Sequence, residues 1–339
     1  MSTINRQIRL ASRPTGEPGA ENFKLVETPV APLADGQVLV RHHFLSLDPY
    51  MRGRMNDAKS YAAPQPLDAV MIGGTAGEVV ESRNPRLKAG DKVVGMGGWQ
   101  EYAVVDADQR GVLQKVDTTQ VPLSAYLGAV GMPGVTGWYG LVKIIDPKAG
   151  ETVVVSSAAG AVGGAVGQLA KVRGARVVGI AGGPDKCRSV VEELGFDECI
   201  DYRLYPDVKS MSGALKAACP DGIDGYFENV GGHLLDAVML RSNAFARVAM
   251  CGMIAGYNGE PIPMTLPQLI LVNRMKLEGF IVSEHMEVWP EALKELGTLV
   301  ATGRLKYRET VAHGIASAPE AFLGLLKGRN QGKQLVKLV

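Results

Sequence analysis

A run of small residues at 156–171, SSAAGAVGGAVGQLAK, follows an apolar segment with three consecutive valines, 153–155. Small residues let the backbone turn sharply and present its N–H groups at the first turn of a helix, where the helix dipole attracts phosphate. The spacing Ala158-x-Gly160-x-x-Gly163 has alanine at the first glycine of the usual dinucleotide fingerprint. A helix packed closely on a sheet would also need small residues here. The preceding strand and the following helix nevertheless favour a site for a dinucleotide pyrophosphate.

The segment AGGPDK, 181–186, indicates which nicotinamide cofactor fits. Enzymes that use NAD usually place an acidic side chain at this strand end to hold the ribose 2′-OH. Here Gly182 and Gly183 leave room for a 2′-phosphate, and Lys186 could supply the counter-charge, although it could also be an ordinary surface lysine. Asp185 follows a proline and fits a first-turn helix acid that complements the dipole. The sequence therefore predicts NADP(H).

Two domains are expected from the 339 residues, because the pattern of expected strands and helices changes near residue 126. Short β-type runs between turn residues over 1–125, together with 300–339, predict a partly antiparallel, barrel-like domain. Strands and helices alternate over 126–299, which predicts a doubly wound parallel sheet with its ligand crevice at the carboxyl ends of the strands. The expected strands are 152–156, 175–180, 198–200, 224–228, 245–251, 276–282 and 334–339, and the expected helices are 161–173, 185–194, 210–218, 231–240 and 317–327.

Composition excludes several classes of protein. The formal net charge is +1, so no nucleic-acid or membrane-surface partner is predicted. No apolar run reaches the roughly 18 residues that cross a bilayer, and the polar start MSTINRQIRLASRP is unlike a signal peptide, so we expect a cytoplasmic enzyme. The closest two of the four cysteines, Cys187 and Cys199, are 12 positions apart (199 − 187), which suggests neither a zinc knuckle nor a disulfide framework.

Several segments, in order, carry a resemblance to a known family: LASRPTGEPGAENFKL (10–25), LSLDPYMRGRM (45–55), GMPGVTG (131–137), AAGAVGGAVGQLAK (158–171), EELGFDECIDYR (192–203), FENVGG (227–232), CGMIAGYN (251–258) and LLKGRNQGKQLV (325–336). The chain resembles the zinc-independent, NADPH-dependent medium-chain dehydrogenase/reductases. The similarity is to the leukotriene B4 dehydrogenase/prostaglandin reductase branch, and within it particularly to bacterial NADPH-dependent curcumin/dihydrocurcumin reductases. This resemblance implies a GroES-like domain, a Rossmann domain and a homodimer.

The resemblance also implies site residues. Lys186 and Tyr202 would meet the 2′-phosphoadenosine end, and Asn330 would reach the cofactor from the other domain. An alternative for Asn229 is a turn-forming residue before two glycines. The residues implied to bind the cofactor are Ala159, Gly160, Ala161, Val162, Gly163, Lys186, Tyr202, Asn229, Cys251, Gly252, Tyr257, Phe280, Ile281, Val282 and Asn330.

No metal site is expected. Where zinc alcohol dehydrogenases of this superfamily carry a cysteine and a Gly-His-Glu motif, this chain has Ser46–Tyr50 and Ile72–Thr75, and the four-cysteine lobe is missing. His42 and His43 are adjacent on a β-type run and so face opposite sides. Without those ligands a Lewis acid is not expected to stabilise an alkoxide, so a conjugated substrate fits better.

The sequence therefore predicts 1,4-reduction of an α,β-unsaturated ketone or aldehyde, with hydride going to the β-carbon. Tyr257 is the predicted catalytic donor to the carbonyl oxygen and a substrate contact, unless it only covers the cofactor. Tyr50 is predicted to form a second wall for substrate, with a core aromatic as the alternative. Two other functions stay open: an NADPH quinone oxidoreductase and a nucleotide-binding protein without turnover.

Overall fold

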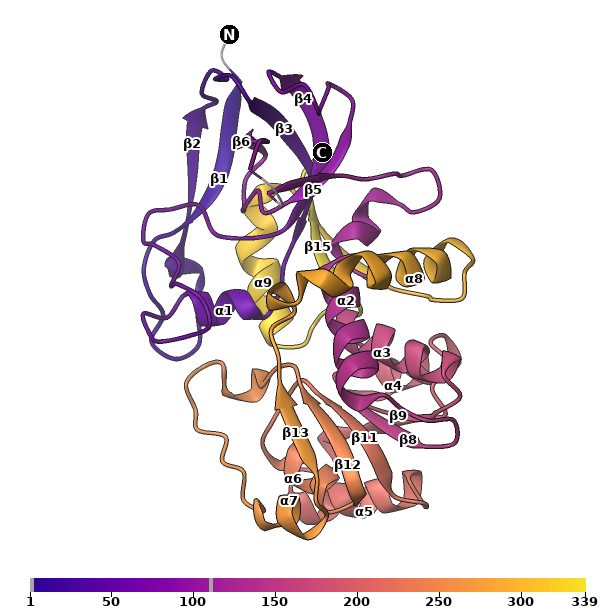
Figure 1. Cartoon of the computed structure of the whole chain (residues 1–339). Helices are drawn as coiled ribbons and strands as arrows, with labels where there is room; N and C mark the ends of the chain where they lie inside the picture. The colour runs from indigo at the N-terminus through magenta and orange to yellow at the C-terminus, as the bar shows by residue number, and fades with distance from the viewer. Residues whose placement is uncertain (1–2, 110–111) are drawn as a thin grey trace. The chain divides into compact units, whose positions relative to one another are not determined.

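The computed structural model describes residues 3–109 and 112–339. The chain divides into two compact units: residues 1–127 with 309–339, called unit 1 here, and residues 128–308, called unit 2. The C-terminal segment thus returns to the unit that holds the N-terminus. Figure 1 labels the helices and strands of both units.

Unit 2 contains a six-stranded parallel sheet in the order β10-β9-β8-β11-β12-β13 among the described residues. The strand order turns back at β8, which is the first strand of this sheet in the order of the chain, so the sheet is doubly wound. The strands are β8 (Thr152–Ser156), β9 (Arg176–Ala181), β10 (Glu198–Asp201), β11 (Ile223–Glu228), β12 (Ser242–Met250) and β13 (Lys276–Gly279).

Alternate residues of the central strand β8 enter two separate cores. Val153 and Val155 pack with α3, whereas Val154 packs with α5 and α6. Because successive side chains of a strand point to opposite faces, helices must cover both sides of this sheet. The helices of unit 2 are α2 (Met132–Tyr139), α3 (Ala161–Val172), α4 (Pro184–Glu192), α5 (Val208–Ala218), α6 (His233–Met239), α7 (Gln268–Val272) and α8 (Trp289–Ala301), with a π-helical turn at Gly140–Ile145.

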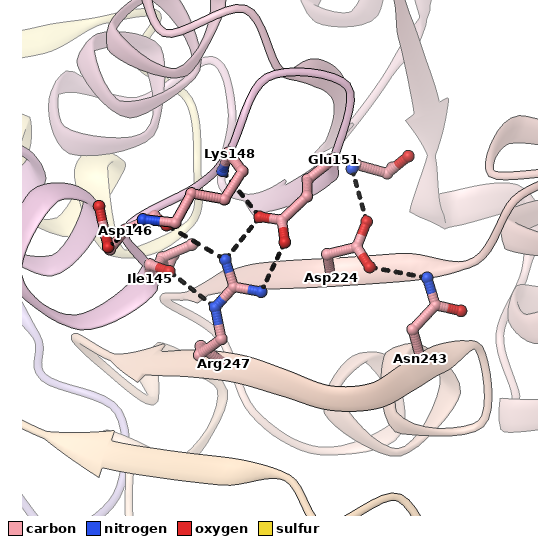
Figure 2. Close-up of polar contacts among 8 residues, drawn as sticks. Ile145, Asp146, Lys148, Glu151, Asp224, Asn243 and Arg247 are labelled. Atoms are coloured by element: carbon pink, nitrogen blue, oxygen red, sulfur yellow. Dashed lines mark hydrogen bonds and ion pairs between the residues drawn. The ribbon is translucent and has the colours of Figure 1, made fainter.

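A polar network ties together the amino ends of the central strands (Figure 2). Arg247 on β12 donates to Glu151 Oε2 at 2.6 Å and to the carbonyl of Ile145 at 2.8 Å. Asp224 on β11 accepts from the main-chain N–H of Thr152 at 2.9 Å. These contacts fix the register of β8, β11 and β12 at the edge opposite to their carboxyl ends.

Unit 1 is built on a mixed, mainly antiparallel sheet of seven strands among the described residues. Its path is β14-β15-β3-β4-β5-β7, and β6 pairs with β3. Its strands are β3 (Gln37–Ser46), β4 (Thr75–Ser82), β5 (Lys92–Gly95), β6 (Tyr102–Asp106), β7 (Leu113–Lys115), β14 (Glu309–His313) and β15 (Lys333–Lys337), with the separate hairpin β1 (Ile4–Leu10) and β2 (Phe23–Pro29). The helices α1 (Tyr50–Arg54) and α9 (Ala318–Leu326) complete the unit.

Two sequence expectations about elements were wrong. The strand expected over 276–282 ends at Gly279, because its partner β12 ends at Met250, which pairs with Gly279. The sequence reading also missed three helices of unit 2, α2, α7 and α8, and α8 has Pro290 in its first turn. Proline usually signals a break, but the first turn of a helix tolerates it because that N–H has no intrahelical partner.

Candidate active site

The predicted cofactor residues of unit 2 gather at one edge of the parallel sheet. The pairing register places Ser156 beside Ile180, and Glu228 beside Met250. The loops that follow β8, β9, β10, β11, β12 and β13 therefore leave the sheet at the same edge. In doubly wound folds this edge, near the reversal of strand order, is where ligands bind.

The turn between β8 and α3 has the geometry that a pyrophosphate needs. Helix α3 begins after Gly160, and no side chain caps its first turn. The N–H groups of a first turn have no intrahelical partners, so they can point to a phosphate. A Cβ at Gly163 would lie 2.4 Å from the carbonyl oxygen of Ser157, so only glycine permits this close packing of turn on helix. Ala158 replaces the first glycine of the fingerprint at a position where its methyl group is fully buried beside Gly179.

Two cations lie beside the glycine pair that follows β9. A Cβ at Gly183 would lie 3.0 Å from a terminal guanidinium nitrogen of Arg203, and one at Gly182 would lie 2.9 Å from the ring of Tyr202. Gly183 also has φ +97°, a backbone conformation that favours glycine. The pKa of Lys186 is lowered by burial and by the positive charge of Arg203.

The side chains of Arg203 and Lys186 allow us to ask whether this site fits the 2′-phosphate of NADPH. Two like charges close enough to lower a pKa repel each other, and a dianionic monoester between them would relieve that repulsion. In the described part of the chain, no ion pair involves Arg203. Asp201 ends β10, and its carboxylate accepts from the main-chain N–H groups of Gly183 at 2.8 Å and Arg203 at 3.1 Å. The residues present therefore fit a 2′-phosphate.

Arg203 is a candidate site residue that sequence reasoning missed. The run IDYR does contain it, next to the predicted Tyr202. Only the return of the chain from β10 toward the loop after β9 brings its side chain to Gly183. The available signal was a basic residue two positions after the end of β10, the strand that pairs with β9.

The loops after β11 and β12 are locked together through Glu228 and Asn229. The side-chain amide of Asn229 donates to the carbonyl of Ser156 at 2.8 Å, and its main-chain N–H donates to Ser156 Oγ at 2.8 Å. The N–H groups of Cys251 and Gly252 both donate to the carbonyl of Glu228, at 2.9 and 3.1 Å. Asn229 thus holds two strand ends in place, and its predicted contact with the cofactor stays a prediction.

Glu228 is a buried acid at this edge. Its side chain is fully buried, and one carboxylate oxygen accepts from Ser156 Oγ at 3.0 Å and from the main-chain N–H of Val230 at 2.5 Å. Burial raises the pKa of Glu228. Burial also raises the pKa of the nearby Cys251 thiol to about 12, with a further contribution from Glu228.

Tyr257 lies in the loop after β12, half-buried. Its phenol oxygen lies 3.1 Å from the position that a Cβ of Gly252 would occupy, and its main-chain N–H donates to the carbonyl of Ile254 at 3.2 Å. The phenol is therefore held at the carboxyl edge of the sheet, beside the loop that Glu228 and Asn229 fix. This is the edge where the dinucleotide residues gather.

Phe280 and Val282 follow β13, and their side chains are buried in the core. The Phe280 ring contacts Tyr139, with ring centroids 5.2 Å apart, and Phe227, at 6.3 Å. Any contact of Phe280 or Val282 with a cofactor would therefore come from the main chain, and Ile281 between them is half-buried.

Tyr50 and Asn330 belong to unit 1, where each has its own surroundings. Tyr50 begins α1 and is half-buried, and burial, with the Asp48 carboxylate, raises the pKa of its phenol. Asn330 is also half-buried, and its side-chain amide donates to the carbonyl of Gly332 at 2.8 Å within its own turn. In the described part of the chain, no group of three or more histidine, cysteine, aspartate or glutamate side chains is arranged to hold a metal ion.

Comparisons with known proteins bear on both units. Residues 6–113 match the family model described as the N-terminal domain of oxidoreductase, and residues 161–298 match the one described as zinc-binding dehydrogenase. The chain is 46% identical to the NADPH-dependent curcumin reductase of Escherichia coli, over 98% of this chain and 97% of that protein. It is 41% identical to the NADP(+)-dependent 2-alkenal reductase of Nicotiana tabacum, again over 98% and 97%.

A solved structure agrees with these relatives. The crystal structure of CurA from Vibrio vulnificus in complex with NADPH matches with a TM-score of 0.92 and 44% identity, covering 98% of this chain and 99% of that one. The chain therefore belongs to the medium-chain dehydrogenase/reductase family, in its prostaglandin reductase/curcumin reductase branch. It is an NADP-dependent oxidoreductase of the alkenal or enone reductase type. The predicted fold class and cofactor are thereby confirmed.

Proposed function

We propose that this protein reduces the carbon–carbon double bond of α,β-unsaturated ketones and aldehydes, and that curcumin-like diarylheptanoids are among the candidate substrates. The supporting relatives are named for curcumin and 2-alkenals. Within the chain, the observation that carries the proposal is the position of the Tyr257 phenol at the edge where the dinucleotide loops leave the sheet. When bound, NADPH supplies a hydride for the β-carbon.

The proposed role of Tyr257 follows from the charge that hydride addition creates. Negative charge develops on the carbonyl oxygen of an enone, and a phenol O–H directed at that oxygen stabilises the enolate. A phenol has an ordinary pKa of about 10, so it keeps its proton at neutral pH. The loop contacts of Cys251 and Gly252 with Glu228 keep this donor in place without reorganisation. The α-carbon is then protonated by Tyr257 or by solvent.

Product analysis with 4-deuterated NADPH tests the reaction. The deuterium is expected at the β-carbon of the saturated product, whereas deuterium at the carbonyl carbon would refute double-bond reduction. A parallel screen of quinones tests the alternative that the protein is an NADPH quinone oxidoreductase. Quinone reduction requires no protonation of an α-carbon, so turnover of quinones but not of enones would favour that alternative. Tyr257→Phe is expected to lower kcat about 100-fold with unchanged NADPH affinity, the usual loss for one donor to an oxyanion. Unchanged turnover would remove Tyr257 from the mechanism.

We also propose that the protein is a homodimer, formed through β13. This strand is an edge of the six-stranded sheet in the described residues and carries Lys276, Leu277 and Glu278. An antiparallel pairing of two copies centred on Leu277 would place Lys276 opposite Glu278 of the second copy. The oligomeric mass from light scattering tests this. Lys276→Glu is expected to weaken the dimer, and adding Glu278→Lys is expected to restore it; an unaltered mass in Lys276→Glu would refute this interface.

No helix in the described part of the chain is both long enough and apolar enough to cross a bilayer. The cytoplasmic location expected from the sequence stays a prediction.

A further inference from the structure

A buried ion pair in unit 1 joins residues that are 285 positions apart. Lys333 Nζ donates to Asp48 Oδ1 at 2.7 Å and to the carbonyl of Leu47 at 2.6 Å. The side chains of Lys333 and Asp48 are only 4% and 8% exposed. Ser46 donates its hydroxyl to the other oxygen of Asp48. The carboxylate therefore has a partner on each oxygen, as a buried charge requires.

This ion pair stands at the start of α1, the helix that carries Tyr50. Asp48 accepts through its main-chain carbonyl from the N–H of Met51 at 3.1 Å, so it belongs to the first turn of that helix. Lys333 begins β15, whose next residue accepts from the N–H of Leu47 at 3.1 Å. Strand β15 thus holds the segment 46–48 in two ways, through the side chain of Lys333 and through the main-chain carbonyl of Gln334.

The far side of α1 is held by a second buried cation. Arg52 is 1% exposed, and it donates to the carbonyl of Gly16 at 2.6 Å and to Asn56 Oδ1 at 2.7 Å. Tyr50 lies between this anchor and Asp48. A five-residue helix has too few hydrogen bonds to be stable alone, so these tertiary contacts must fix its place and direction.

A buried ion pair is a poor way to gain stability, because desolvation of the two charges offsets their attraction. Its advantage is direction: charge-assisted hydrogen bonds have a narrow geometry. We propose that Asp48 and Lys333 are positioning residues that hold the side chain of Tyr50 in the orientation required for substrate. This inference rests on the proposed function, in which Tyr50 contacts the enone.

Three variants separate positioning from stability. Lys333→Met leaves the Asp48 charge buried and unpaired, so its melting temperature is expected to fall. Asp48→Asn combined with Lys333→Met removes both charges, and its melting temperature is expected to recover. If the pair positions Tyr50, the double variant is still expected to show about a 100-fold lower kcat/KM for an enone, the scale of a misplaced contact group. Its NADPH affinity, measured by fluorescence titration, is expected to be unchanged. Lys337→Met, an exposed lysine on the same strand, is the control and is expected to match the wild type in both measurements.

A double-mutant cycle with Tyr50→Ala completes the test. If Lys333 acts through Tyr50, adding Lys333→Met to Tyr50→Ala is expected to cause little further loss of kcat/KM. Recovery of kcat/KM along with the melting temperature, or fully additive losses in the cycle, would overturn the inference while leaving the proposed reaction intact. If Tyr50→Ala alone leaves the enone kcat/KM unchanged, the substrate role of Tyr50 is refuted and this inference with it. The reaction itself is judged separately by the position of the deuterium.

Discussion

Arg203→Gln is expected to weaken the binding of NADPH without affecting that of NADH. The guanidinium lies beside Gly183 and lowers the pKa of Lys186, which places two cations where a 2′-phosphate fits. A hydrogen bond to a charged group contributes about 1.5–3 kcal/mol. Because Arg203 is exposed, solvent screens its charge and the lower end of that range applies. A loss of about 1.4 kcal/mol corresponds to a tenfold higher Kd for NADPH.

Lys186→Gln is expected to cost more, because this side chain is half-buried and its charge is screened less. A loss of about 2.8 kcal/mol would raise the Kd for NADPH roughly 100-fold. Both Kd values can be measured by the fluorescence of the reduced nicotinamide, at low and at high salt. The effect of each substitution is expected to shrink as salt rises.

Arg188→Gln is the matched control. Arg188 lies on the same helix as Lys186, is exposed, and pairs with Asp185 at 3.2 Å. It is expected to leave both affinities unchanged. Equal weakening of NADPH and NADH by Arg203→Gln would show a general distortion of the site. No change in either affinity would show that Arg203 does not contact the 2′-phosphate. Either of these two results would refute the proposed role of Arg203.

Four further predictions concern the fold and its pH dependence. Gly163→Ala is expected to destabilise the protein by about 1–3 kcal/mol and to weaken NADPH binding, since the methyl group would collide with the carbonyl of Ser157. Gly213→Ala, at an open helical position on α5, should instead stabilise it by about 0.5–1 kcal/mol in the same denaturation assay. Arg247→Met is expected to lower stability by about 2 kcal/mol at unchanged NADPH affinity, because its network lies at the opposite edge of the sheet (Figure 2); weaker NADPH binding would contradict this. Burial lowers the pKa of His42 from 6.5 to about 4. As the pH falls from 6.5 to 4, the unfolded chain therefore binds a proton at His42 that the folded chain does not, and the free energy of unfolding is expected to fall by about 3 kcal/mol. His42→Gln should flatten that part of the pH–stability curve.

Local pattern was enough to predict the strand and helix on either side of the glycine-rich turn, and the alternating sheet. The run of valines at 153–155 and the small residues after it specify a buried strand followed by a close-packed helix. Both features depend on neighbours in the sequence, so a linear reading captures them. The helix at 318–326 was also predicted to within a residue at each end, because its apolar residues recur at helical spacing within one short segment. The end of β13 was not predictable in this way, because the length of its partner strand decides where pairing stops.

The site residues divide along the same line. Gly160, Gly163 and the missing acid at 182–183 could be proposed as candidates from the sequence, because the fingerprint is contiguous. Arg203 and the buried pair of Asp48 and Lys333 could not, because each depends on segments that meet only when the strands pair. By itself, then, the sequence determined the fold class and the preference for a phosphorylated cofactor, and it predicted where the pyrophosphate turn lies. Only the tertiary structure decided which charges meet, because Coulomb attraction and desolvation depend on distance in space and on burial, and neither is encoded by separation along the chain.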